Sequence, residues 1–215
     1  MIDTCSYDRL AYVTETEPTG GLRERKRLAA MQRIQAIALA LFEEHGFATV
    51  TIERIATDAD VSPSSVYRYF GTKEQIVLWD DYDPVWAASI ATEPPGSDPF
   101  DAVRNAVDAL ASGALHSDEA LLRRRVKLMM EEPSIEAASV LGWYRAAEDF
   151  GTAISAMLGR EHGDLGIQLF SHAIVGAITG GIHHWYESGF TTPLTTIFEQ
   201  VLASFEHGFD LKDLR

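Results

Sequence analysis

Apolar side chains recur at three- and four-residue intervals along most of the chain, the spacing that places them on one face of an α-helix. The first such segment begins at Leu22 and ends at Gly46, a residue type that favours helix termination. Runs of Val and Ile in strict alternation with polar residues, which are typical of strands, are absent. The pattern predicts an all-α fold of about nine helices, preceded by a flexible tail over residues 1–21.

Two short helices are predicted after the first one. Thr51 stands where an N-cap is expected, and Ser62 followed by Pro63 is a cap followed by proline at the first helical position. A tight connection separates the two helices, and the small residue Ala56 suits a close crossing. Residues 51–70 therefore have the form of a helix-turn-helix.

The remaining boundaries follow from caps and prolines. Predicted helices begin near Lys73, at Pro99 after the cap Asp98, after the caps Ser117 and Ser134, and at about Asp164 and Pro193. The helix from Lys73 is expected to be interrupted at Asp83 and Pro84, because a proline ring removes an N–H and disfavours helical geometry before it.

The second helix of a helix-turn-helix lies in the major groove with its N-terminal side chains on base edges. Here that helix offers small hydroxyls, tyrosines and an arginine able to bond guanine bidentately or to hold a phosphate. The candidate contacts are Ser62, Ser64, Ser65, Tyr67, Arg68, Tyr69 and Lys73. On these residues alone, a pair of short core helices with a serine cap remains the alternative.

The order Thr-Ile-x-x-Ile-Ala, Val-Ser and Val-Tyr-x-Tyr-Phe-x-x-Lys over residues 51–73 resembles the TetR family of bacterial regulators. Phe42, Gly46 and Phe47 also match. The resemblance implies a helix-turn-helix DNA-binding domain over residues 22–72 and a larger helical ligand-binding and dimerisation domain over residues 73–215. It carries phosphate or base contact onto Thr51, Ser62, Ser64, Ser65, Tyr67, Arg68, Tyr69 and Lys73.

Two positions depart from the family pattern. Asp60 stands in the turn where glycine is usual, and aspartate tolerates positive φ better than most residues. Tyr69 stands where histidine is common, so its phosphate bond would come from a hydroxyl.

The formal net charge of −14, taken as an average, argues against a nucleic-acid partner. The charge is unevenly distributed, however. Residues 76–215 hold nine basic and 21 acidic side chains, whereas residues 22–75 hold eight basic and seven acidic ones. Five basic residues near the start of the first helix face only one acid: Arg23, Arg25, Lys26, Arg27 and Arg33. This asymmetry predicts two domains with different partners.

The last two predicted helices have the composition of a dimer interface. One has several small residues that permit close helix approach, and the other has a continuous apolar stripe. The candidates are Gly176, Gly180, Leu194, Ile197, Phe198, Val201 and Phe205. The alternative is packing of these helices within one chain.

Aromatic and sulfur-containing side chains in the middle of the chain suit an apolar or amphipathic ligand. Trp86, Met129 and Trp143 are the candidate pocket residues, with ordinary core packing as the alternative. The basic run from Arg123 to Lys127 is interpreted either as a site for an anionic head group or as a solvated helix face.

A single cysteine, Cys5, leaves no intrachain disulfide and no cysteine-based zinc site, which favours a reducing, cytoplasmic location. His172 and His183 share a helix face but lie about 16 Å apart at 1.5 Å per residue, so no metal site is predicted. Glycine-rich phosphate loops and nucleophile elbows are absent, so we expect no catalytic activity and no cofactor. The apolar stretch 173–182 is shorter than a bilayer span, so no membrane partner is expected.

Together these features predict a sequence-specific transcriptional regulator. The expected form is a homodimeric repressor that leaves its operator when a small apolar or amphipathic ligand binds the C-terminal domain. The alternative is an all-α small-molecule-binding protein or enzyme without specific DNA binding.

Overall fold

The computed structural model describes residues 21–79, 88–112, 119–161 and 163–207. Throughout these ranges the chain is helical, with short turns and no strand, as the apolar periodicity predicts. The predictions for residues 1–20, for the interruption at Asp83 and Pro84, for the cap Ser117 and for Trp86 lie outside the described residues.

Four helices form the N-terminal part: α1 (Leu22–His45), α2 (Ile52–Asp58), α3 (Pro63–Phe70) and α4 (Lys73–Leu78). Their starts are set by short side chains that accept backbone N–H groups. The Thr51 hydroxyl accepts from the amide of Arg54, and the Ser62 hydroxyl accepts from the amide of Ser65, both at 3.2 Å. The two predicted caps of the helix-turn-helix are therefore confirmed.

The turn between α2 and α3 uses the left-handed conformation that glycine usually supplies. Asp60 has a φ of 52°, and the following amide, that of Val61, donates to the carbonyl of Ala56 at 2.9 Å. Ala56 itself is fully buried where the two helices cross. An aspartate thus holds the tight turn, as its tolerance of positive φ allows.

The C-terminal part contains α6 (Pro99–Ser112), α8 (Glu119–Glu131), α9 (Pro133–Leu158), α10 (Leu165–Glu187) and α11 (Leu194–His207). Asp98 caps α6 by accepting from the amide of Phe100 at 2.7 Å, and Asp164 caps α10. The predicted cap Ser134 is wrong. It lies inside α9, because Pro133 already occupies the first turn with its φ preset for a helix.

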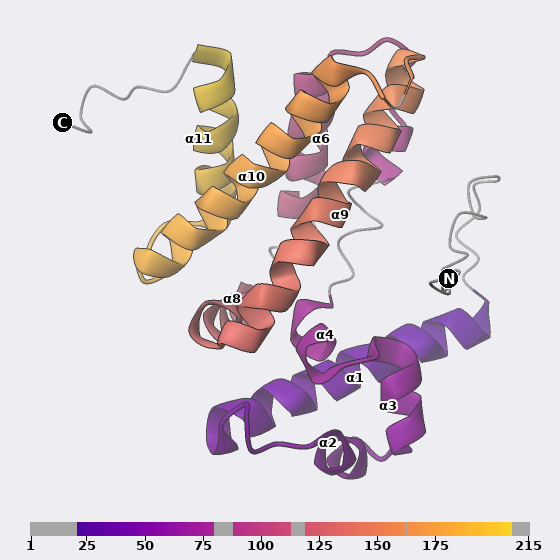
Figure 1. Ribbon diagram of the computed structural model, residues 1–215, viewed down its shortest axis with the longest axis vertical. Helices are drawn as coiled ribbons and strands as arrows, with labels where there is room; N and C mark the ends of the chain where they lie inside the picture. The colour runs from indigo at the N-terminus through magenta and orange to yellow at the C-terminus, as the bar shows by residue number, and fades with distance from the viewer. Residues whose placement is uncertain (1–20, 80–87, 113–118, 162, 208–215) are drawn as a thin grey trace, which may run out of the picture.

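Figure 1 shows α9 and α10 lying side by side and antiparallel, with α11 on the other side of α10 and the α1–α4 group at the other end of the molecule. α6 packs against α11. The α9–α10 crossing is close because it uses small residues. A Cβ on Gly151 would lie 3.1 Å from the Ser171 hydroxyl oxygen. α4 packs on α1 and α3 and also on α8 and α9, so it joins the two groups of helices.

By length and composition alone, α10 is long and apolar enough to cross a membrane. The apolar segment is therefore longer than the 173–182 stretch identified in the sequence. One such helix is weak support for a membrane span, and here α10 packs against α8, α9 and α11. Only 22% of its most apolar window is buried by the single chain, so one face of α10 is left uncovered.

Candidate nucleic-acid interface

Helix α3 divides into a buried face and an exposed face. Val66 and Phe70 are buried on the side of α3 that packs on α2 and α4, and the residues on the opposite side point away from the protein. The exposed residues are Pro63, Ser64, Tyr67 and Arg68. Tyr67 is 48% exposed, which is unusual for so large a ring and leaves it available to a ligand. Three of the predicted contact residues therefore share one outward face, while Ser65 and Tyr69 are half-buried.

The serines at the start of α3 form a connected group of hydroxyls. The Ser62 oxygen lies 2.9 Å from the hydroxyl oxygens of both Ser64 and Ser65. Arg68 contacts this group, since its Nη2 lies 3.4 Å from the Ser65 oxygen, and its guanidinium stands 5.0 Å from the centre of the Tyr69 ring. These contacts orient Arg68 along the exposed face, and a guanidinium has five N–H donors to offer.

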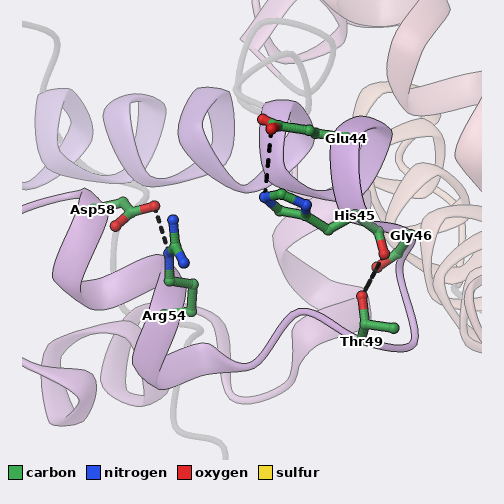
Figure 2. A network of polar contacts seen from close by, with 6 residues as sticks. All are labelled: Glu44, His45, Gly46, Thr49, Arg54 and Asp58. Carbon is green, nitrogen blue, oxygen red and sulfur yellow. Dashed lines mark hydrogen bonds and ion pairs between the residues drawn. The ribbon is translucent and has the colours of Figure 1, made fainter.

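Arg54 on α2 is a candidate contact that the sequence reasoning missed. Its side chain is 58% exposed, one turn beyond the N-cap Thr51. Asp58 accepts from its Nε at 2.8 Å, and this hydrogen bond and the nearby charge raise the pKa of Arg54 (Figure 2). The only sequence signal was its position one turn after the cap of a predicted DNA-binding helix.

The connection before α2 is fixed by hydrogen bonds to the end of α1. The Thr49 hydroxyl donates to the carbonyl of His45 and, at 3.1 Å, to that of Gly46 (Figure 2). Gly46 has a φ of 81°, which ends α1 where the sequence predicts a stop. The connection therefore brings Thr51, which is exposed, to the N-terminal end of α2.

Lys73 has an intramolecular role that its sequence position did not reveal. Its ammonium donates to the carbonyls of Phe47 at 2.6 Å and Val50 at 3.0 Å, and lies 4.2 Å from the centre of the Phe47 ring. The side chain thus ties the start of α4 to the α1–α2 connection. Phosphate contact by Lys73 stays a prediction, to be weighed against this structural use of its charge.

The predicted basic segment lies on α1. Arg23, Arg25, Lys26 and Arg33 are exposed, whereas Arg27 pairs with Glu24 at 2.8 Å. Exposed arginine and lysine side chains contribute the electrostatic, sequence-independent part of DNA binding.

The predicted dimer residues separate into two groups. Leu194, Ile197 and Phe198 are buried within the single chain, where Ile197 and Phe198 pack against the backbone of Gly181 on α10. These three side chains are thus packed inside one chain, and a direct contact of theirs with a second copy stays a prediction. Gly176 and Gly180 are exposed with open space around them, and Val201 and Phe205 are half-buried.

Two of the candidate pocket residues, Met129 and Trp143, lie within the described residues, and their role in a pocket stays a prediction. Met129 is buried in the core, while the Trp143 ring on α9 stands 6.3 Å from that of His183. A cavity of about 280 Å³ in the described part of the chain lies instead between α10 and α11, beside Gly180, His184 and Gln200.

The basic run on α8 also has intramolecular partners. Arg123 pairs with Glu119 and stands 5.6 Å from the ring centres of Trp185 and Phe190. Arg124 and Arg125 bind groups in α1 and α4. Each of these three arginines therefore has an intramolecular partner, and the two interpretations of the run stay predictions.

Solved structures of transcriptional repressors share this fold. One is the Thermus thermophilus repressor FadR in complex with lauroyl-CoA, at 19% identity and a TM-score of 0.53 over 83% of this chain and 94% of that one. Another is Stenotrophomonas maltophilia SmeT in complex with triclosan, at 18% identity and a TM-score of 0.52 over 82% and 91%.

Two curated relatives are similar in sequence. The transcriptional regulator TcmR of Streptomyces glaucescens is 28% identical over 158 residues, covering 70% of this chain and 68% of TcmR. The putative mycofactocin biosynthesis regulator MftR of Mycobacterium tuberculosis is 24% identical over 194 residues, covering 85% and 94%. Both relatives are regulators of transcription.

The match to known families covers both parts of the molecule. Residues 34–78, which include the helix-turn-helix, match the bacterial regulatory proteins of the tetR family, and residues 97–210 match the MftR C-terminal domain. With the capped α3 and its exposed polar face, these matches show that the chain is a DNA-binding transcriptional regulator belonging to the TetR family.

Proposed function

We propose that the protein is a cytoplasmic, homodimeric repressor that binds operator DNA through α3 and is released by a small apolar or amphipathic effector. The exposed face of α3 carries this proposal, because Ser64, Tyr67 and Arg68 point away from the core at the end of a capped helix. Residues 22–72 would bind DNA and residues 73–215 would bind the effector and the second copy.

On DNA, α3 would lie in the major groove with Arg68 able to bond guanine. Thr51, Arg54 and the hydroxyls of Ser62 and Ser64 would bond phosphates, which set position rather than sequence preference. The exposed arginine and lysine side chains of α1 would add a salt-dependent attraction to the DNA backbone. Two copies of α3 about 34–36 Å apart would read two half-sites, so the function requires a dimer.

The uncovered face of α10 supports a dimer. Leu165 is 69% exposed and Leu169 is 62% exposed, and the same face continues through Gly176 and Gly180, where backbones can approach closely. The cavity beside Gly180 lies between α10 and α11 and offers space for side chains of a second copy. We propose this face, flanked by the half-buried Val201 and Phe205, as the two-fold interface.

Four phenylalanines from four helices form an apolar cluster in the C-terminal part, with Phe150 buried and the other three half-buried. The Phe170 ring on α10 lies 5.0 Å from that of Phe100 on α6 and 5.8 Å from that of Phe150 on α9, and Phe205 on α11 lies 6.1 Å from Phe100. The similar repressors SmeT and FadR were solved with triclosan and lauroyl-CoA, which are apolar and amphipathic ligands. These observations support an effector of that class.

The test begins with selection of DNA sequences bound by the full chain from a random duplex library. We expect enrichment of a palindromic sequence with two half-sites, followed by tight binding of that fragment in fluorescence anisotropy and weaker binding of scrambled DNA. Failure to enrich any sequence would favour the alternative of a helical binding protein or enzyme that lacks specific DNA binding.

A further inference from the structure

The end of α4 is held by side chains from both parts of the molecule. A helix leaves the carbonyls of its last turn without intrahelical partners. Gln35 of α1 donates through Nε2 to the carbonyls of Ile76 at 2.7 Å and Trp79 at 2.6 Å. Arg125 of α8 donates to the two carbonyls between them, at 2.8 Å to Val77 and 3.1 Å to Leu78. The carbonyls of residues 76–79 therefore all accept hydrogen bonds, two from a side chain of α1 and two from a side chain of α8.

Both of these side chains are buried, with Gln35 only 2% and Arg125 only 9% exposed. A buried guanidinium is tolerated when its N–H groups are bonded, and the negative end of a helix dipole is a favourable place for it. Removing either side chain would leave buried carbonyls unsatisfied. Moving α4 relative to α1 or α8 would therefore break buried hydrogen bonds at a cost in free energy. Such bonds are suited to holding the two parts of the molecule in one relative orientation.

The neighbouring residue on α8, Arg124, contacts a second helix of the N-terminal part, α1. Arg124 binds Glu43 of α1 through two parallel bonds, Nε to Oε1 at 2.6 Å and Nη2 to Oε2 at 2.8 Å. Both side chains are about one-third to one-half exposed, so solvent screens the pair. Its bidentate geometry nevertheless fixes direction as well as distance.

α8 also reaches the core of the C-terminal part, and α4 reaches the DNA-binding helix. Val126 and Met129, within one turn of Arg125, are buried in the core. At the other end, the Trp79 ring packs edge-on against Phe70, the last residue of α3, with 6.0 Å between ring centres. A shift of α8 would therefore be passed through the end of α4 to α3.

We propose that Arg124 and Arg125 form a clasp that sets the orientation of the DNA-binding domain on the C-terminal domain, and with it the affinity for operator. The inference rests on the proposed function as an operator-binding regulator. Arg124 and Arg125 are positioning residues, because they touch α1 and α4 rather than DNA.

The first test exchanges the charges of the surface pair in the full-length protein. Arg124→Glu alone and Glu43→Arg alone should each lower affinity for the selected operator fragment about fivefold or more, and the double variant, which has the wild-type net charge, should recover it. Lys127→Glu is the matched control, since Lys127 lies on the same helix and pairs only loosely with Glu131 at 4.0 Å. It should leave the operator affinity within about twofold of wild type.

The second test measures hydrogen exchange of the α4 and α1 amides without DNA. Arg125→Met should raise exchange in α4 about tenfold or more, and Arg125→Lys should give an intermediate increase, because a lysine retains charge but not the planar fork. If Arg125→Met does not fold, Arg125→Lys and the charge exchange still decide the matter.

Wild-type operator affinity in both single charge variants, or unchanged α4 exchange in Arg125→Lys, would overturn the clasp. Failure of the wild-type protein to select any DNA sequence would instead refute the proposed function. In that case the exchange measurements would still test whether Arg125 holds α4.

Discussion

The two ends of the molecule differ in how completely one chain covers its own apolar side chains. Among the described residues of α1 to α4, Tyr67 is the large apolar side chain that stands out as exposed, and it lies on the face of α3 that we propose contacts DNA. In the C-terminal part, Val140, Leu141, Leu165 and Leu169 are each more than half exposed. The N-terminal part is thus closed by its own packing, whereas the C-terminal part leaves apolar side chains uncovered, including the α10 face that we propose as the two-fold interface.

This difference separates two kinds of functional surface. The N-terminal surface presents polar and basic side chains on a well-packed core, and such groups bind the phosphate backbone of DNA. The exposed surface of α10 is apolar and small-residue-rich, and its burial would stabilise an assembly. Substitutions should therefore affect binding at one end and assembly at the other, and the following predictions test that separation.

The largest effect is expected from closing the space at the α10 face. Gly176→Lys with Gly180→Lys should convert the dimer to a monomer, because added side chains and like charges would meet across the two-fold axis. Operator affinity should fall about 100-fold or more through loss of the paired half-site. Sedimentation velocity and anisotropy measure the two effects.

The same double variant should not weaken the single chain. Neither glycine has a neighbour within 4 Å of an added Cβ, and replacing a helical glycine gains about 0.5–1 kcal/mol of helix propensity per site. Ala120→Lys with Ala137→Lys, at exposed positions of α8 and α9, adds the same two charges and is the matched control. A stable dimer in the glycine variant would refute the proposed interface.

At the opposite end, Arg68→Ala should weaken operator binding by about 1–3 kcal/mol, or roughly 5- to 150-fold, while leaving the dimer intact. Scrambled DNA should lose less affinity if Arg68 contacts a base. Equal losses on both DNA sequences would make Arg68 a phosphate contact, and Lys127→Ala controls for the change in net charge.

Lys73→Met should lower the free energy of unfolding by about 1–3 kcal/mol, because the carbonyls of Phe47 and Val50 lose a charged donor. Thermal denaturation against Gln75→Met, an exposed position of the same helix, measures this effect. The salt dependence of DNA binding tests the phosphate contact separately, since loss of one contact should reduce the slope by about one. Unchanged stability would exclude the structural role.

The smallest effect concerns the turn of the helix-turn-helix. Asp60→Gly should stabilise the protein by about 0.5 kcal/mol. Glycine adopts a φ of 52° without the strain of a side chain, but it also raises the conformational entropy of the unfolded chain, which offsets part of the gain. Asp60→Asn keeps the conformational preference without the charge and should be nearly neutral. Stabilisation by Asp60→Asn as large as by Asp60→Gly would point to charge rather than to backbone geometry.

The sequence predicted well where the determining interactions are local. The caps Thr51, Ser62 and Asp98 each bond an amide two or three residues ahead, so residue type and spacing are enough to identify them. The outward face of α3 likewise follows from the spacing of Val66 and Phe70. Ser134 was the failure of this kind, since a proline one residue earlier competes for the start of the same helix.

Where a side chain faces a distant part of the chain, sequence reasoning was weaker. Periodicity identified the apolar stripe of Leu194, Ile197 and Phe198, yet it could not show that these side chains are buried within one chain, with Ile197 and Phe198 against Gly181 of α10. Lys73 was placed correctly at the start of α4, but its bonds to carbonyls 23 and 26 residues earlier carry no local signal. Arg54 was overlooked because a cationic side chain on a short helix is unremarkable without its surface position.

The sequence by itself determined the helices, their caps, the helix-turn-helix and the separation of basic and acidic regions, because these depend on contacts within about one helical turn. Only the tertiary structure decided that α8 packs against the N-terminal part. Arg125 bonds a carbonyl 48 residues away in the sequence, and Arg124 bonds a carboxylate 81 residues away. Such contacts depend on how whole helices pack, and the same adjacent arginines on another scaffold would face water.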